Sequence, residues 1–159
     1  MDFSLTEEQQ ILSRTAREFL EAECPTTVVR EAENSEKGYL PDLWKKMANL
    51  GWLGVSLPEN YGGIGGSLTD QTVLFEEIGR ALVPGPLLTS SVLAAQILLD
   101  SRNETQKQNL LPGIANGELI VTLARGERLE TSSDDTGIVL SGESPVSYTH
   151  LTLPTICSV

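Results

Sequence analysis

The chain has 159 residues, of which 40% are hydrophobic and 21% charged, as in ordinary folded domains. The net charge of -11 repels phosphate backbones and anionic lipid surfaces, so we expect no nucleic-acid partner. No apolar run reaches the roughly 18 residues of a membrane helix, and the first residues do not resemble a signal peptide, which predicts a cytoplasmic protein without membrane insertion. Because Cys24 and Cys157 are the only cysteines, we predict no structural metal site.

The last fourteen residues differ in composition from the rest of the chain. Val146–Val159 contains no Asp, Glu, Lys or Arg, whereas every earlier region is rich in them. Its first ten residues, VSYTHLTLPT, resemble a translated sequencing adapter of the transposase type. The alternative is a natural strand, since apolar and polar residues alternate. We interpret 146–159 as a non-native tail and give no catalytic weight to His150, the only histidine.

Chain breakers and apolar spacing predict two helices in the first 33 residues. Ser4 and Glu7 have the spacing of a capping box, which places the start of a helix there. Apolar residues then recur at helical spacing to about Ala22. Pro25 disfavours helix at the residue before it, so a second, shorter helix is expected at 27–33.

A third helix is expected from Pro41 to Gly51, because proline suits the first helical turn and glycine suits the left-handed residue after a helix. The next segment, 52–67, holds five glycines and one proline, which indicates a conformationally specific loop. Four of its glycines form two pairs, and no buried strand precedes them, so they do not make a dinucleotide-binding fingerprint. Ser67 or Thr69 is expected to cap a fourth helix.

Two more helices complete the predicted bundle. Segment 91–99 is apolar on nearly every side, and 104–111 is amphipathic, with Pro112 and the residues after it expected to end the helix. The spacing of apolar residues then changes from helical to extended. A buried strand is predicted at Leu119–Ala124, and a second strand at 137–142 after a polar connection. The predicted fold is mainly α, an amino-terminal bundle of about six helices followed by the first strands of a truncated β domain.

Four stretches of the sequence together resemble a known family. They are DFSLTEEQQ with AREFL, LWKKMANLGWLGVSLPENYGG, LFEEIGRAL and LLPGIANGELIVTLA. Over residues 1–145 the chain resembles the acyl-CoA dehydrogenases. The resemblance implies an amino-terminal helical domain at 1–117, the start of a truncated middle β-barrel domain at 118–145, and a carboxy-terminal four-helix bundle in sequence that is absent here. The adapter-derived tail at 146–159 lies outside the resemblance.

The resemblance also implies the chemistry of the parent protein. The family binds FAD and removes two hydrogens from the Cα–Cβ bond of an acyl-CoA thioester. Because its catalytic base lies in the carboxy-terminal bundle, no residue of this chain is predicted as catalytic. An electron-transfer flavoprotein or a similar acceptor and a homo- or hetero-oligomer are expected for the full-length protein. Two strands cannot close a barrel, so the fragment alone is expected to be inactive.

A flavin contact is implied where the first barrel strand of the family ends in a motif of the form ALTEP. Arg125 replaces an apolar residue of this motif, Gly126 stands where a threonine hydroxyl would bond the flavin, and Glu127 matches the motif glutamate. Backbone groups remain available for the flavin, because main-chain bonds need no particular side chain. The departure is compatible with a divergent enzyme, which we favour, and with a non-catalytic partner subunit. The predicted cofactor-binding residues are Leu123, Ala124, Arg125, Gly126 and Glu127.

The resemblance further implies a turn and a substrate wall. Ser132, Ser133 and Asp134 are expected to replace a Gly-Ser-Asp turn of the family. The acyl chain in the family lies between the helical domain and the barrel. Apolar helix faces are buried with or without a ligand, so ordinary core packing is the alternative, and stronger, interpretation of the wall. A different class of answer is that residues 1–118 form a stand-alone helical interaction module. The candidate substrate-binding residues are Leu74, Phe75, Ile78, Ser90 and Leu93.

Overall fold

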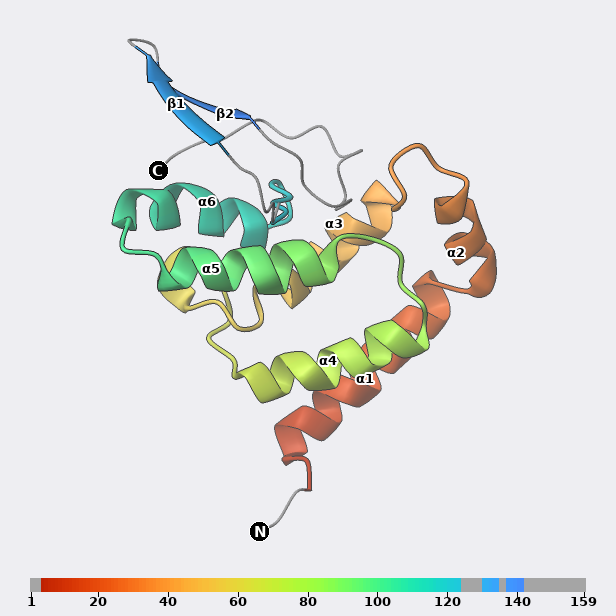
Figure 1. The fold of residues 1–159 in the computed structure, drawn as a ribbon. Helices are drawn as coiled ribbons and strands as arrows, with labels where there is room; N and C mark the ends of the chain where they lie inside the picture. The colour runs from red at the N-terminus through yellow and green to blue at the C-terminus, as the bar shows by residue number, and fades with distance from the viewer. Residues whose placement is uncertain (1–3, 124–129, 135–136, 142–159) are drawn as a thin grey trace.

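The computed structural model describes residues 4–123, 130–134 and 137–141. In this part the chain is mainly α, as predicted, with the helices packed into one bundle and a two-stranded antiparallel hairpin after it (Figure 1). Within the described ranges, no helix is both long and apolar enough to cross a lipid bilayer. The elements are α1 (Glu7–Glu23), α2 (Thr26–Glu33), α3 (Pro41–Asn49), η1 (Trp52–Gly54), η2 (Glu59–Tyr61), α4 (Leu68–Arg80), η3 (Leu88–Ala94), α5 (Ala95–Asp100), α6 (Glu104–Ala115), β1 (Glu130–Asp134) and β2 (Gly137–Ser141).

The capping box of α1 lies two residues later than predicted. Thr6 is the N-cap, its Oγ1 accepts from the backbone N of Gln9 at 3.2 Å, and the Gln9 Oε1 accepts from the Thr6 backbone N at 3.1 Å. Ser4 with Glu7 and Thr6 with Gln9 both have the residue types and the spacing of a capping box. Gln9 also donates from Nε2 to Oδ1 of Asp70 in α4 at 2.8 Å. The residue that completes the observed capping box therefore also joins α1 to α4. The Ser4–Glu7 prediction was therefore wrong.

The predicted boundaries of α3 and α4 agree with the structure. Gly51 follows α3 with φ 75°, the left-handed conformation expected of it. Ser67 caps α4, with its Oγ accepting from the backbone N of Asp70 at 3.2 Å and the Asp70 carboxylate accepting from the Ser67 backbone N at 2.7 Å. Thr69, the alternative cap, lies inside the helix.

Helix α6 continues through Pro112, which was predicted to end it. The helix runs to Ala115, and Gly117 takes the left-handed conformation after it with φ 77°. An internal proline costs a helix one hydrogen bond. Here the last turn carries Ile114 and Ala115, both buried in a hydrophobic cluster with Leu111, and this burial offsets the loss.

The strands differ most from prediction. Residues 119–123 form no sheet pairing in the described part of the chain, and β1 lies instead at Glu130–Asp134, within the predicted polar connection. The backbone N–H of Val121 is satisfied by the side chain of Ser90, so it needs no strand partner. Ser132, Ser133 and Asp134 accordingly lie in a strand and not in the predicted turn. The second strand was predicted correctly.

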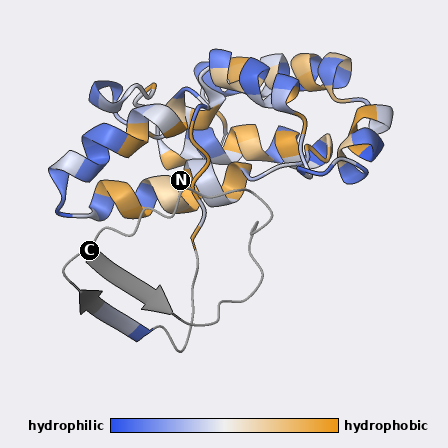
Figure 2. Ribbon diagram, turned by 90° about the horizontal axis from the view of Figure 1, so that it is seen from above, coloured by the Kyte–Doolittle hydropathy of each residue, from blue (hydrophilic) through white to orange (hydrophobic). Residues whose placement is uncertain are grey.

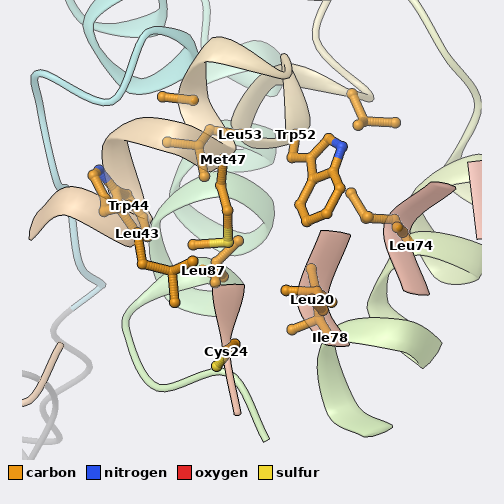
Figure 3. Close-up of a cluster of buried hydrophobic side chains, with 13 residues drawn as sticks. Leu20, Cys24, Leu43, Trp44, Met47, Trp52, Leu53, Leu74, Ile78 and Leu87 are labelled. Carbon is orange, nitrogen blue, oxygen red and sulfur yellow. The ribbon is translucent and has the colours of Figure 1, made fainter. Parts of the chain in front are cut away.

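The helices enclose two hydrophobic clusters. Figure 2 shows that hydrophilic and hydrophobic residues are interspersed along the helices. The first cluster joins α1, α3, η1 and α4, and Trp52 and Phe19 meet edge to face in it at 5.1 Å between ring centroids. The second joins the glycine-rich loop, α5 and α6. Figure 3 shows the centre of the first cluster. The first cluster consists of Ala16, Leu20, Cys24, Leu43, Trp44, Met47, Ala48, Trp52, Leu53, Val55, Leu74, Ile78 and Leu87, and the second of Leu57, Tyr61, Ala95, Leu111, Ile114 and Ala115.

Candidate functional site

The predicted substrate wall divides into core residues and surface residues. Leu74 is fully buried and Ile78 is 6% exposed, and both lie in the first cluster beside Leu20 (Figure 3). Phe75 is half-buried against the same cluster. Leu93, in contrast, exposes 43% of its surface. The packing of the α4 residues supports their interpretation as core, whereas Leu93 is available to a neighbour.

Ser90 ties the helical bundle to the segment that leads toward the predicted flavin residues. Its side chain is completely buried on η3, and its Oγ accepts from the backbone N of Val121 at 3.1 Å. Leu119 is held nearby, since its backbone N donates to the carbonyl of Gly113 at 2.8 Å. The chain therefore leaves the bundle in a direction fixed by η3 and α6. The sequence assigned Ser90 to a substrate wall, but this supporting bond was not foreseen.

Of the predicted flavin residues, only Leu123 can be placed. Ala124, Arg125, Gly126 and Glu127 lie outside the described residues, so their contacts remain a prediction. Leu123 exposes 44% of its surface. Leu82 and Leu88 are more exposed than Leu123, and single exposed apolar residues are common on folded proteins, so this exposure by itself does not indicate a bound ligand.

A buried carboxylate clamps α4 to α1. Glu77 is 2% exposed, and the Arg17 guanidinium donates to its Oε1 at 2.7 Å and to its Oε2 at 3.0 Å. Ser13 donates to Oε1 at 2.9 Å, and Arg80 approaches Oε2 at 3.3 Å. The hydrogen bond from Arg17 holds the pKa of Glu77 below its ordinary value, although burial acts in the opposite direction. A carboxylate with lowered basicity and occupied oxygens is a structural group and a poor general base.

A cleft near the end of the bundle does not coincide with the predicted site. It encloses about 430 Å³ between α3 and the turn after α6, with Tyr39, Lys45 and Glu118 in its wall. Trp44, also in the wall, donates from Nε1 to the carbonyl of Gly117 at 3.0 Å. Among the described residues, no three His, Cys, Asp or Glu side chains gather closely enough to hold a metal ion.

Comparison with known proteins identifies the class of this bundle. The family model for the acyl-CoA dehydrogenase N-terminal domain matches residues 6–118, more than half of the chain. The chain therefore belongs to the acyl-CoA dehydrogenase family.

Individual relatives agree with this assignment. The chain is 31% identical over 140 residues to the acyl-CoA dehydrogenase IpdE2 of Mycolicibacterium smegmatis, covering 87% of this chain and 43% of that protein. It is 35% identical over 127 residues to bovine mitochondrial isovaleryl-CoA dehydrogenase, covering 77% of this chain and 29% of that protein. The chain thus spans less than half the length of these relatives.

Solved structures show the same fold. The ChsE4–ChsE5 complex from Mycobacterium tuberculosis contains a chain that matches with a TM-score of 0.78 and 29% identity, over 89% of this chain and 40% of that one. Butyryl-CoA dehydrogenase from Megasphaera elsdenii matches with a TM-score of 0.72 and 26% identity, over 89% of this chain and 41% of that one. These matches confirm the helical domain that the four sequence stretches predicted.

Proposed function

We propose that this chain is the amino-terminal part of an FAD-dependent acyl-CoA dehydrogenase, which oxidises the Cα–Cβ bond of an acyl-CoA thioester. The match to the family's N-terminal domain over residues 6–118 carries the proposal. When bound, FAD supplies the acceptor for the β-hydride. The catalytic base belongs to sequence that the 159-residue chain does not contain, so the fragment by itself is inactive.

The described residues have a supporting part in this reaction. Ser90 holds the segment at Val121 and thereby positions Leu123, the first of the predicted flavin contacts. The Arg17–Glu77 clamp holds α4 against α1 and keeps the core residue Leu74 in place. Such groups act by fixing geometry, since displacements of an ångström at a reacting centre cost large factors in rate.

The decisive test is recovery of the flanking genomic DNA, followed by purification of the full-length protein. We expect the reading frame to continue past Pro145 into a barrel and a terminal bundle, and the product to be yellow. Anaerobic addition of a matching acyl-CoA should bleach the flavin absorbance, and a flavoprotein acceptor should restore it. A frame that encodes the present ending as genuine sequence, with nothing beyond it, would refute the proposal. Oxidation of an acyl-CoA by the purified 159-residue chain would refute the inactivity of the fragment.

A second candidate is a non-catalytic subunit of a mixed oligomer. It is favoured by Gly126 in place of the flavin-bonding threonine and by the likeness to a chain of the ChsE4–ChsE5 complex. This alternative predicts a colourless, well-folded full-length protein. Addition of a catalytic subunit encoded nearby should then produce a mixed complex on size-exclusion chromatography.

A further inference from the structure

The turn after α6 contains the one Asn-Gly pair of the sequence, Asn116–Gly117. An asparagine followed by glycine is especially prone to lose its side-chain amide, because glycine has no β-carbon to hinder the approach of its backbone nitrogen. That nitrogen can attack Cγ, the carbonyl carbon of the Asn116 side chain. Asn116 is exposed, so water and hydroxide reach it. A reactive pair of residues therefore lies where the chain leaves the bundle.

The reaction at this pair needs only water and hydroxide. Hydroxide removes the proton from the Gly117 backbone nitrogen, the nitrogen forms a bond to Cγ of Asn116, and the bond from Cγ to Nδ2 breaks with release of ammonia. The product is a succinimide ring. Water then opens the ring at either carbonyl carbon and gives aspartate or isoaspartate, in which the main chain runs through the former side chain. No oxidant or reductant takes part.

The folded turn keeps the reacting atoms apart. Ring closure requires the Gly117 nitrogen to eclipse Cβ of Asn116 about the Cα–C bond, whereas the observed ψ of 0° makes it eclipse the Asn116 backbone nitrogen. The Gly117 nitrogen also donates to the carbonyl of Ile114 at 3.2 Å. The Asn116 side chain is occupied too, since Nδ2 donates to Oε2 of Glu118 at 2.9 Å and Oδ1 accepts from the Glu118 backbone N at 3.0 Å. Attack therefore requires the turn to open locally.

Contacts with α3 and η1 hold the turn closed. The carbonyl of Gly117 accepts from Nε1 of Trp44 at 3.0 Å, and Trp44 is only 4% exposed. A β-carbon at Gly117 would lie 2.8 Å from Cβ of Ala48 and 3.1 Å from Cδ1 of Leu53. The backbone of the turn therefore packs directly on these elements, and opening the turn breaks the Trp44 hydrogen bond.

We propose that Asn116 is a deamidation site whose rate is set by opening of the turn at 114–118. The inference goes beyond the proposed function and does not depend on it. In the aspartate product a carboxylate oxygen faces Oε2 of Glu118 in place of the amide donor, so a hydrogen bond is replaced by like-charge repulsion. Isoaspartate also lengthens the main chain within the turn. Both products loosen the connection from α6 to the segment that Ser90 holds at Val121.

The first test compares the folded and the unfolded 159-residue chain. Samples are incubated in mildly alkaline buffer with and without unfolding concentrations of urea, and their peptides are analysed by mass spectrometry. We expect Asn116 to deamidate at least roughly tenfold faster in urea, which corresponds to about 1.4 kcal/mol of opening free energy or more. Asn109, an exposed asparagine followed by leucine, is the internal control.

Two results of this comparison would overturn the proposal. Deamidation of Asn116 in urea that is no faster than that of Asn109 would exclude a reactive site. Equal rates at Asn116 in the folded and the unfolded chain would exclude control by the turn. Hydrogen exchange at the Gly117 amide supplies an independent measure, because the same opening exposes it. Its protection factor should match the factor by which folding slows deamidation, and a clear mismatch would also exclude control by the turn.

The second test removes the anchor of the turn. Trp44→Phe keeps an aromatic ring and deletes the Nε1 donor to Gly117. Asn116 should then deamidate about fivefold faster, a factor that corresponds to roughly 1 kcal/mol, or one hydrogen bond. Trp52→Phe makes the same change at a buried indole that packs on Phe19, and it should leave the rate unchanged. An unchanged rate in Trp44→Phe that is folded by circular dichroism would overturn the proposal. If Trp44→Phe does not fold, the hydrogen-exchange comparison on the wild type decides.

Discussion

Replacing Leu82 by glycine should stabilise the protein. Leu82 is the one non-glycine residue with positive φ in the described ranges, at 53°, and it closes the end of α4. Its backbone N donates to Gly79 and that of Val83 donates to Ile78, each at 3.1 Å, which is the Schellman pattern. The left-handed conformation costs a residue with a β-carbon about 1–2 kcal/mol and costs glycine almost nothing.

The expected gain follows from two opposing contributions. The Leu82 side chain is 65% exposed, so its removal forfeits little apolar burial. Glycine has more freedom in the unfolded chain, which takes back about 0.5–1 kcal/mol. Leu82→Gly should therefore raise the free energy of unfolding by about 0.5–1 kcal/mol and Tm by about 1–4 °C. Urea unfolding followed by circular dichroism measures the first quantity, and a thermal scan measures the second.

Two neighbouring variants isolate the backbone conformation as the cause. Leu82→Ala removes most of the side chain but keeps the β-carbon, so it should be close to neutral. Ala81→Gly changes the adjacent residue, whose φ of -82° suits any amino acid, and should destabilise by about 0.5–1 kcal/mol. A loss of stability in Leu82→Gly as large as that in Ala81→Gly would refute the reasoning.

Three further predictions concern Glu77, Gly63 and Ser90. The pKa of Glu77 lies below its ordinary value of 4.5, so the ionised carboxylate stabilises the fold above that pH. This stabilisation is lost as the pH falls through the folded-state pKa. In acid titrations the free energy of unfolding of Glu77→Gln should therefore fall less steeply below about pH 4.5 than that of the wild type. Gly63→Ala should cost about 3 kcal/mol or more in urea unfolding, because its methyl group would overlap the backbone carbonyl of Leu57, and a wild-type midpoint would contradict this. Ser90→Ala should speed hydrogen exchange at the Val121 amide, and unchanged protection there would show that another group holds this segment.

Local patterns predicted most of the helical fold. Gly51 and Ser67 were assigned correctly because a left-handed glycine and an N-cap serine act on residues next to them. The errors arose where a tertiary contact decided between local options. Pro112 remained helical because the turn after it is buried, and 119–123 found its backbone partner in Ser90 and not in a strand.

The site was less predictable than the fold, because its contacts join distant parts of the sequence. Glu77 is bound by Arg17, which lies 60 residues away, and nothing local distinguishes Arg17 from Arg14 on the same helix. The flavin residues after Leu123 were suggested by family resemblance alone.

The π-helical turn at Leu88–Ala94 makes this helix respond differently to the deletion and to the insertion of a single residue. A π-helical turn accommodates one residue more than an α-helical turn, so deletion of one residue would allow the segment to relax into ordinary α-helix, with the later side chains keeping their direction and Ala95 staying in the second cluster. Insertion of a further residue would instead turn every later side chain of α5 relative to α6. Insertions in this stretch should therefore be far more damaging than insertions in the polar turn at 101–103, which joins α5 to α6.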